Sequence, residues 1–486
     1  MKLGTVVIGG LVFLSLIATY SVFQKEEDPT IEMRVKLEEY KNKLMYADAI
    51  TEYKQILNNT ADEDKYALII ELRDYAKSVD RTSAYIDACK QAVSKVPTDT
   101  ESGGAVLDYM RSKADREIYS YVNNLITKTS ELKSSKDAAT AEAAAAAYDF
   151  YVGYYDTVKG DYKLSNLGLM SVSEWVNDTF AIGQLDEDND VVINTAGERI
   201  VDEGHGHFDS YSPKEKYLAT VHENQHVYMS LNDNRKLVPY NSSTKELIYY
   251  DYLGTFQGGI ANFSYDNGKW GILNTNMTER YSGLEAAAAV SNNFYAIKSD
   301  GKWKIMYHDT QNRGGDVEVF TCNDLYLEDG YFINTRTLIN NGNAVKVVVY
   351  ARNDASSHWT AYKLTVDASD SKTYSTKSEA LGSLSFEDVK LFGNGYGAVK
   401  LNGSWCFIDS KGEVVEAMGT HNDAKSLYCG LAAVQSATNN RWGYIDSKGN
   451  IIIDFQFDEA NSLSSKGTAA VLDGSSWRLL RLREYD

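Results

Sequence analysis

The sequence predicts a multidomain protein in which an N-terminal α-helical region precedes an all-β repeat domain. Apolar side chains recur near helical spacing up to about residue 158 and alternate from about residue 175 onward. Tryptophan-centred segments then return at intervals of about 35 residues. The chain also holds only 4 Pro against 35 Tyr and 35 Gly, a balance typical of β-meanders with tight turns.

The overall composition narrows the class of protein. Of the 486 residues, 43% are hydrophobic and 24% are charged, which excludes wholesale disorder and a collagen-like structure. This length predicts two or three domains of roughly 100–200 residues each. Lys and Arg number 49 and Asp and Glu number 68, so the net charge is −19. Because such a chain repels phosphate backbones, we expect no nucleic-acid partner.

The first predicted element is a transmembrane anchor, residues 1–24. Leu3 to Phe23 is a run of 21 uncharged residues, long enough to span a bilayer as a helix, and residues 17–23 offer no convincing cleavage site. One Lys precedes the run and five Lys or Arg follow it by residue 43, a distribution that by itself would keep the large domain cytoplasmic. An anchor with so short a leading tail commonly inserts like a signal sequence. We therefore expect a single-pass cell-membrane protein with its bulk outside the cytoplasm.

Residues 30–160 form the predicted α-helical region. Apolar residues recur at helical spacing between residues 31 and 57, Asn58–Thr60 breaks the pattern, and Pro97 ends a later helix. The segments YADAITEYKQIL, with Ala49, and YIDACKQAVSKVP, with Ala88, resemble the second helix of a tetratricopeptide repeat. Their spacing is 39 residues rather than 34, and the full signature is missing. A plain helical bundle or stalk is the alternative.

A second helical stretch is predicted from about residue 105 to 158. It contains the alanine-rich run Ala143–Ala147, which needs no functional interpretation because Ala is the best helix former. Ser102–Gly104 and Gly160–Asp161 have the composition of connectors between elements.

The β-repeat domain is predicted over residues 175–486. Its clearest copies are GYGAVKLNGSWCFIDSKGEVV (395–415) and GLAAVQSATNNRWGYIDSKGNII (430–452), each a strand, a polar turn, a strand led by Trp, a Ser-Lys-Gly turn and a further apolar strand. Six more segments keep all or part of this unit. They are 180–201, 216–238, the segments around Trp270, Trp303 and Trp477, and 344–366. We therefore expect eight copies of about three strands each.

The units Trp270–Asn274 and Trp442–Gly449, with Gly430–Val434 upstream of the second, resemble WG-repeat (KWG-repeat) proteins. The resemblance covers about 300 residues. It departs from the pattern where Lys304, Cys406 and Arg478 replace the Gly after Trp. It implies a bacterial repeat protein of the binding or scaffolding kind, often found beside helical modules or membrane anchors. No catalytic residue follows from it, because the motif is structural.

Each part of the motif has a physical role in a repeat array. The large apolar Trp at the start of a strand can seal the seam between successive units. The following Gly lets a neighbouring backbone approach, and the Gly of Ser-Lys-Gly supplies the left-handed residue of a short hairpin. We expect closure into a β-propeller, since a ring protects strand edges, with an open β-solenoid as the alternative. The chain ends after two strands of the last unit, so closure would need a strand from near residues 170–182.

One segment matches a catalytic motif. His222–His226 reads HENQH, the zinc-protease pattern H-E-x-x-H, which requires a helix to bring its two His together. Here it lies between two alternating runs, in register with the turn that precedes Trp442, so we expect a hairpin turn and no zinc. His205 and His207 are the nearest further ligand candidates, and a solvated loop is expected there.

Other chemical signals are weak. Asp186–Asp190 lacks the fixed Gly and terminal Glu of a calcium loop and is predicted to be a solvated turn. Cys89, Cys322, Cys406 and Cys429 show no C-x-x-C pairing. Cys406 and Cys429 either form one disulfide or remain free buried thiols. We predict no catalytic, cofactor-binding or metal-binding residues and no cofactor.

These observations predict a membrane-anchored, non-enzymatic repeat protein that mediates protein–protein binding or scaffolding. The net charge of −19 favours partners with basic or neutral surfaces. Binding of carbohydrate or the cell wall through Tyr-rich surfaces is one alternative. A zinc metallopeptidase built on HENQH is another, disfavoured one.

Overall fold

The computed structural model describes residues 30–115, 117–176, 178–202, 204–222, 225–233, 235–237, 248–289, 293–308, 315–333, 339–341, 344–353, 358–367, 369 and 373–485. The chain divides into two compact units, Met1–Lys159 and Gly160–Asp486. The described part of the first unit is α-helical and the second is a β-propeller, so the predicted fold class is confirmed.

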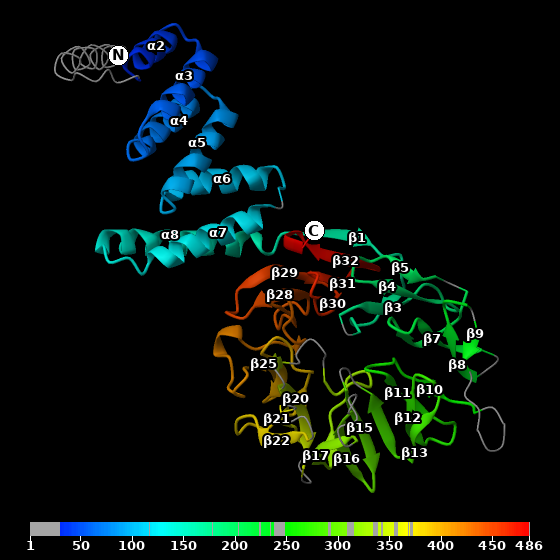
Figure 1. The fold of residues 1–486 in the computed structure, drawn as a ribbon. Coiled ribbons are helices and arrows are strands. Elements are labelled where there is room, and N and C mark those ends of the chain that lie inside the picture. The colour runs from blue at the N-terminus through cyan, green and yellow to red at the C-terminus, as the bar shows by residue number, and fades with distance from the viewer. Residues whose placement is uncertain are drawn as a thin grey trace. The chain divides into compact units, whose positions relative to one another are not determined.

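Seven helices make up the described part of the first unit (Figure 1). They are α2 (Thr30–Asn42), α3 (Tyr46–Asn59), α4 (Lys65–Ser78), α5 (Thr82–Lys95), α6 (Thr100–Ser112), α7 (Glu117–Leu132) and α8 (Ala138–Val158). Ala49 and Ala88 are fully buried in one core with Leu68 and Leu72. The helical character of this region is thus confirmed, while its tetratricopeptide-like nature stays a prediction.

The expectation that Ser102–Gly104 is a connector is wrong, because these residues lie in the first turns of α6. Asp99 caps this helix by accepting the backbone N–H of Ser102 at 3.0 Å. A Cβ on Gly103 would lie 2.2 Å from the Tyr151 hydroxyl of α8. Small residues are therefore needed here for close helix packing and not for a turn.

The predicted membrane anchor, residues 1–24, lies outside the described residues. From Thr30 on, none of the helices that the structure describes is both long and apolar enough to cross a bilayer.

The second unit contains eight antiparallel sheets, the blades of an eight-bladed propeller, which we number in chain order from the blade of β2 (Figure 1). Blades 1 to 4 contain β2 (Ser171–Val172), β3 (Phe180–Gln184), β4 (Asp190–Asn194), β5 (Arg199–Val201), β6 (Phe208–Ser212), β7 (Tyr217–His222), β8 (Gln225–Ser230), β9 (Arg235–Leu237), β10 (Tyr252–Leu253), β11 (Ile260–Ser264), β12 (Trp270–Asn274), β13 (Glu279–Leu284), β14 (Ala286–Ala289), β15 (Phe294–Ser299), β16 (Lys302–Tyr307) and β17 (Val317–Cys322). Each of these blades takes four consecutive strands.

Blades 5 to 7 continue the series, and blade 8 closes it. Their strands are β18 (Asp324–Leu325), β19 (Ile339–Asn341), β20 (Ala344–Arg352), β21 (Thr360–Asp367), β22 (Ser375–Ala380), β23 (Asp388–Val389), β24 (Gly397–Leu401), β25 (Ser404–Ile408), β26 (Asp423–Ala424), β27 (Leu431–Gln435), β28 (Trp442–Asp446), β29 (Ile451–Phe457), β30 (Glu459–Ala460), β31 (Thr468–Asp473), β32 (Ser476–Leu482) and, from the start of the unit, β1 (Tyr162–Asn166). Short 3₁₀ helices lie at Glu416–Met418 and Arg483–Tyr485. The eight blades agree with the eight predicted copies.

The ring closes through β1, which pairs antiparallel with β32 from Tyr162↔Leu482 to Asn166↔Arg478 (Figure 1). Closure is thus confirmed, but its predicted source near residues 170–182 is wrong. Those residues form β2 and β3 of blade 1, which pair with each other. The short run YKLSN provides the missing strand because Leu164 packs against the same core as Leu480.

The repeated tryptophans fill the seams between blades, as predicted. Trp477 of blade 8 packs with Val191 and Ile193 of blade 1, and Trp442 of blade 7 packs with Ala469 and Val471 of blade 8. Trp303 and Trp405 likewise pack against the blade that follows. All four are no more than 6% exposed, whereas Trp270 is only partly buried.

The glycine after tryptophan permits a β-bulge. In β12 and β28 the pairing register shifts directly after Trp270 and Trp442. A Cβ on Gly443 would lie 2.5 Å from the Ile453 carbonyl oxygen. In β16 the residue after Trp is Lys304, and there the register stays regular until Ile305. The unit around Trp303 therefore differs from the pattern because it does not bulge directly after its Trp.

Candidate functional site

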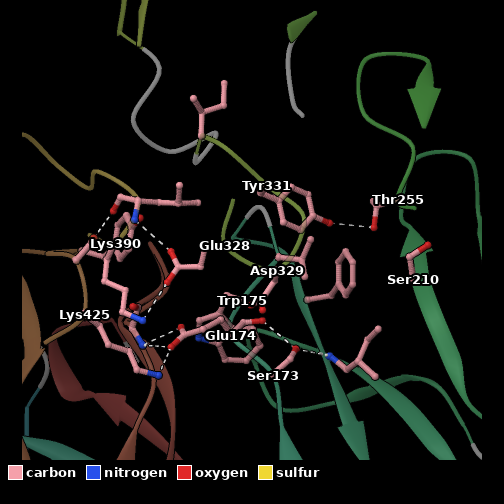
Figure 2. Close-up of a pocket in the computed structure, with 18 of the residues that line it drawn as sticks. Ser173, Glu174, Trp175, Ser210, Thr255, Glu328, Asp329, Tyr331, Lys390 and Lys425 are labelled. Atoms are coloured by element: carbon pink, nitrogen blue, oxygen red, sulfur yellow. Dashed lines mark hydrogen bonds and ion pairs between the residues drawn. The ribbon is translucent and has the colours of Figure 1, made fainter. Parts of the chain in front are cut away.

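A cavity of about 410 Å³ lies where the blades of the propeller converge (Figure 2). Its lining comes mainly from the first strands of the blades and from the loops that follow them, with Phe180 and Ile182 from the second strand of blade 1, and seven of the eight blades contribute. A pocket of this size, with apolar walls and a few convergent polar groups, has the properties of a ligand site.

The rim of the cavity is shaped by a turn that recurs from blade to blade. Residues 257–260, 328–331, 393–396 and 428–431 each close on themselves through an isolated antiparallel bridge. The two central residues of every one have positive φ, as in Asp329 (+51°) and Gly330 (+81°). A type I′ turn requires this conformation, which explains Gly in the second place of all four. The repeat therefore fixes the backbone around the cavity and leaves the side chains free to vary.

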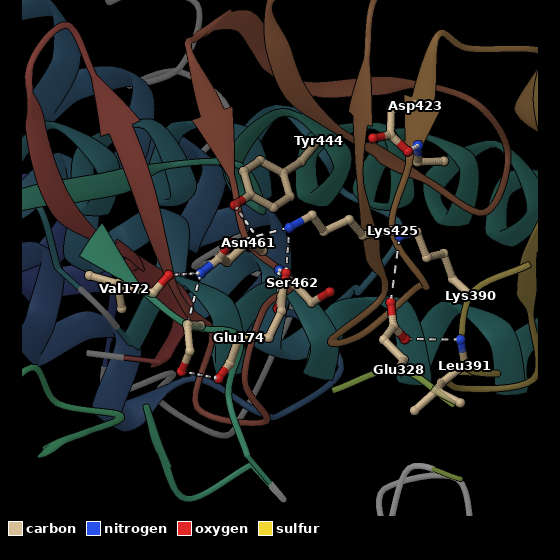
Figure 3. A network of polar contacts seen from close by, with 12 residues as sticks. Val172, Glu174, Glu328, Lys390, Leu391, Asp423, Lys425, Tyr444, Asn461 and Ser462 are labelled. Atoms are coloured by element: carbon tan, nitrogen blue, oxygen red, sulfur yellow. Dashed lines mark hydrogen bonds and ion pairs between the residues drawn. The ribbon is translucent and has the colours of Figure 1, made fainter. Parts of the chain in front are cut away.

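One wall of the cavity ties blades 1, 7 and 8 together through Lys425 (Figure 3). The Lys425 ammonium lies 2.6 Å from Glu174 Oε1 and donates to Asn461 Oδ1 at 3.2 Å. Glu174 also accepts the backbone N–H of Ser462 at 3.0 Å. Burial by itself would lower the pKa of Lys425, but the carboxylate of Glu174 outweighs it, so this pKa is raised. Lys425 is therefore a fully charged, fully engaged group at neutral pH.

A second, looser pair continues this wall through blades 5 and 6. Glu328 accepts the backbone N–H of Leu391 at 3.2 Å, while its other oxygen lies 3.7 Å from the Lys390 ammonium. Burial raises the pKa of Glu328, and the neighbouring carboxylates of Glu174 and Asp329 add to the effect. Glu328 thus retains acceptor capacity toward the cavity.

The opposite wall carries hydroxyl groups and aromatic rings (Figure 2). The Tyr331 hydroxyl donates to Thr255 Oγ1 at 3.3 Å, and the Ser210 hydroxyl donates to the Leu253 carbonyl at 2.8 Å. Trp175 is held by its indole N–H, which donates to the Thr468 carbonyl at 3.0 Å. Burial raises the pKa of Tyr331, so the phenol stays neutral. This wall offers π faces, and Asp209 beside Ser210 is a further carboxyl group in the lining.

The HENQH segment lies in a β-hairpin, as predicted. His222 ends β7 and pairs with Gln225, the first residue of β8. The Nδ1 atom of His226 lies 2.5 Å from Oδ2 of Asp209, a residue of strand β6 in the same blade. Burial is the main influence on Asp209 and raises the pKa of this carboxyl. Among the described residues, no group of three His, Cys, Asp or Glu side chains is arranged to hold a metal ion.

The other residues singled out in the sequence are apart from the cavity lining. Asp186 lies in the turn between β3 and β4, where it accepts the backbone N–H of Asp188. The carbonyls of His205 and His207 accept the Thr220 hydroxyl. All four cysteines are free thiols. Of the two alternatives for Cys406 and Cys429, the structure therefore shows the free thiols and not the disulfide.

Sequence reasoning named no site residues, and it missed the charged wall. A signal was present: in the copies around Trp405 and Trp442, Lys390 and Lys425 hold the same place, directly after the first strand. The backbone N–H of each donates to the second strand of its blade, to Ala398 and Ala433 respectively. Aligning the copies over this position would have identified both lysines as cavity residues.

A second, shallower hollow of about 630 Å³ lies between blades 4 and 5. Its aromatic rings are already covered. The guanidinium of Arg352 lies over the Trp359 ring at 4.2 Å, and Trp303 is only 4% exposed. Stacking of a sugar ring on these residues would require both to move.

Solved structures with a similar arrangement are distant in sequence. BamB from Moraxella catarrhalis is 10% identical, with a TM-score of 0.36, over 65% of this chain and 99% of that one. Kluyveromyces lactis Hsv2 is 10% identical, with a TM-score of 0.30, over 58% and 98%. Pyrococcus horikoshii acylaminoacyl peptidase is 12% identical, with a TM-score of 0.30, over 62% and 53%. No function follows from likenesses of this degree.

No curated protein matches the chain in sequence. Residues 442–477, from the start of β28 to the second residue of β32, match the family model described as WG containing repeat. The chain therefore carries a WG-type repeat at residues 442–477, within an eight-bladed propeller.

Proposed function

We propose that this chain is a membrane-anchored, non-enzymatic protein that binds or scaffolds other proteins, and that its propeller takes a segment of the partner into the central cavity. The observation that carries the proposal is the cavity itself. It is lined from seven blades, and three of its polar groups, Glu328, Asp329 and Tyr331, sit on a turn whose backbone geometry recurs in four blades. Preorganised groups of this kind reduce the ordering cost of binding.

The reactive groups that the structure describes support a binding role rather than catalysis. Burial raises the pKa of Cys322 to about 12 and that of Cys406 to about 11, so neither thiol is a ready nucleophile. The Ser210 hydroxyl at the cavity donates to a backbone carbonyl. The imidazole of His226 contacts the carboxylate of Asp209. Among the described residues, it makes no hydrogen bond to the hydroxyl of a serine or the thiol of a cysteine.

The location in the cell is a separate part of this proposal. It is supported by the 21 uncharged residues from Leu3 to Phe23. Protease added to intact cells should degrade the helical and propeller units. Full protection of both units, with degradation after the cells are opened, would place the bulk of the chain in the cytoplasm instead.

Cavity binding can be tested by filling the cavity from an exposed position. Ser173 lines the cavity and is exposed, so Ser173→Trp should occupy it without disturbing the core. The control is Ser165→Trp, an exposed serine on β1 away from the cavity lining. The full chain is exposed to a random heptapeptide mixture, and the retained peptides are measured by mass spectrometry. We expect retention by the wild type and by Ser165→Trp, and its loss in Ser173→Trp.

A second variant guards against a folding defect. Ile182→Trp fills the same cavity from β3, and the β-sheet circular dichroism of all variants is compared first. If a folded Ser173→Trp or Ile182→Trp protein retains the same peptides as the wild type, the cavity is not the binding site.

A further inference from the structure

The residues that line the central cavity carry more carboxyl groups than ammonium groups, and this excess indicates the charge of the ligand that the cavity can bind. Among the described lining residues, four carry carboxyl groups and two carry ammonium groups. The carboxyl residues are Glu174, Asp209, Glu328 and Asp329, and the ammonium residues are Lys390 and Lys425. The excess is negative, as it is over the whole chain, whose net charge is −19. A cavity with this excess attracts cations.

The two lysines do not form an anion site. Lys425 is engaged by Glu174 and Asn461, and its ammonium lies 5.7 Å from the ring of Trp442. Lys390 lies 3.7 Å from Glu328 and 5.5 Å from the ring of Trp405. An anion would have to compete with Glu174 and Glu328 for the two lysines. It would also be repelled by the other two carboxyl groups in the lining. A cation is attracted by the excess of carboxylates and would share Glu328 with the Lys390 ammonium.

The acceptors that remain belong to two consecutive residues of the turn of blade 5, Glu328 and Asp329, and both line the cavity (Figure 2). Among the residues that the structure describes, the Lys390 ammonium is the partner of Glu328 Oε1, at 3.7 Å, a distance longer than a hydrogen bond. Asp329 follows directly, exposed, at the left-handed position of the type I′ turn. Two adjacent carboxylates repel each other, and a cation bound to both would relieve that repulsion. Burial is the main cause that raises the pKa of Glu328, and the carboxylates of Glu174 and Asp329 add to it.

Aromatic rings complete the same part of the cavity. Tyr331 follows Asp329 by two residues, and Tyr252 and Trp175 face the cavity from blades 3 and 1. A flat cation packs on such rings by cation–π attraction. A guanidinium suits this arrangement better than an ammonium, since it is less strongly hydrated, stacks on aromatic faces and bonds to carboxylates in a fork.

We propose that the central cavity receives an arginine side chain of the partner protein, with its guanidinium on the carboxylates of Glu328 and Asp329 and beside the ring of Tyr331. This inference rests on the proposed function and adds the chemistry of the bound segment. Cavities of this volume hold small ligands, so one long side chain with its adjoining backbone is a suitable occupant.

The test compares capped heptapeptides that differ only at the central residue. The full chain is titrated with peptides that carry arginine, lysine, citrulline or glutamate in an otherwise Gly/Ser sequence, and affinity is measured by fluorescence anisotropy. We expect arginine to bind most tightly, and neutral citrulline, which has nearly the same shape, to bind about tenfold more weakly or worse because a charge-assisted contact is lost. Added salt should weaken the arginine peptide more than the citrulline peptide.

Matched variants locate the contact. Glu328→Gln and Asp329→Asn should each lower arginine-peptide affinity about tenfold, since each removes one charged acceptor. The control is Asp300→Asn. Asp300 and Gly301 form a turn of the same kind, with φ of +53° and +73°, between β15 and β16 and outside the cavity lining. Because Asp300 is also exposed, this variant removes the same charge from the same backbone geometry and should leave affinity unchanged.

The outcomes separate this inference from the proposed function. Equal binding of the arginine and citrulline peptides, or tighter binding of the glutamate peptide, would overturn the arginine site while leaving cavity binding intact. An equal loss in Asp300→Asn and Asp329→Asn would show general electrostatic attraction and would also overturn it. If no peptide of either experiment binds in a way that Ser173→Trp abolishes, both the site and the proposed function fail.

Discussion

The seams between blades and the central cavity are built from the same repeat but use it in opposite ways. At the seams, one residue type recurs: Trp303, Trp405, Trp442 and Trp477 each pack on the following blade. At the cavity, the place directly after the first strand changes from blade to blade. In six blades the backbone N–H at this place donates to the second strand, but the residues are Ser173, Gly254, Tyr326, Lys390, Lys425 and Asn461, of which Ser173, Lys390 and Lys425 line the cavity.

This contrast separates architecture from recognition. A seam must exclude water between two twisted sheets, so the same large apolar residue serves at each of these four seams. The cavity is lined from seven blades, so each of them can contribute a different group without disturbing its neighbours. Positions that repeat therefore report the fold, and positions that break the repeat report the site.

The largest expected effect comes from the seams. Trp442→Ala should lower the free energy of unfolding of the propeller by about 3–5 kcal/mol, because a side chain only 6% exposed would leave a void between blades 7 and 8. Trp270→Ala, at the same place in blade 3, should cost less because Trp270 is only partly buried. Urea unfolding followed by β-sheet circular dichroism measures both. Equal losses of unfolding free energy in the two variants would mean that burial of the tryptophan in the seam does not determine how much stability it contributes.

A smaller effect is expected from the glycine after tryptophan. In Gly443→Ala the new Cβ would meet the Ile453 carbonyl at 2.5 Å, a backbone atom that cannot move aside freely, so stability should fall by about 1–3 kcal/mol. Lys304 holds the same place in a strand without a bulge, and its ion pair with Glu318 is exposed. Lys304→Ala should therefore change stability by less than about 0.5 kcal/mol. A Gly443→Ala protein as stable as Lys304→Ala would contradict the bulge argument.

The same contrast explains how far the sequence could predict the structure. The Trp–Gly pairs, the left-handed Gly449 of Asp-Ser-Lys-Gly and the alternating strands each have a local physical cause, so the β-repeats and their number could be predicted. The strand β1 could not, because YKLSN is short and carries no motif. Its role arises only when the ring brings Leu164 beside Leu480.

The residues of the cavity were also harder to predict from the sequence, because their contacts depend on packing between distant segments. Glu174, Glu328 and Lys425 lie up to 251 residues apart in sequence, and their contacts exist only once seven blades surround one axis. For Ser102–Gly104 the sequence predicted a connector that does not exist. Gly often marks a turn, but here it lies within α6, where its small size allows the helix to pack on Tyr151. Local composition predicts local conformation, whereas both of these features depend on packing between distant segments.

The smallest expected effect is a pH dependence that originates at the cavity and not at the seams. The groups that face Glu328 are Lys390, Lys425, Glu174 and Asp329, and burial is the main cause that raises the pKa of Glu328 above its ordinary value of 4.5. Between 4.5 and the raised pKa, the folded chain binds more protons at this carboxyl than the unfolded chain does. Its ionisation therefore destabilises the fold fully above the raised pKa and not at all below 4.5.

Glu328→Gln removes this contribution while it keeps an oxygen that can accept the Leu391 N–H. The unfolding free energy of the wild type minus that of Glu328→Gln should accordingly become more positive as the pH falls from 8 toward 4. Urea unfolding at intervals of pH measures this difference, and any effect of the other carboxyl groups cancels between the two proteins. A difference that moves the other way would mean that Lys390 stabilises the ionised carboxylate more than burial opposes it. Glu328 would then be a satisfied structural ion pair rather than a group held ready for a cation.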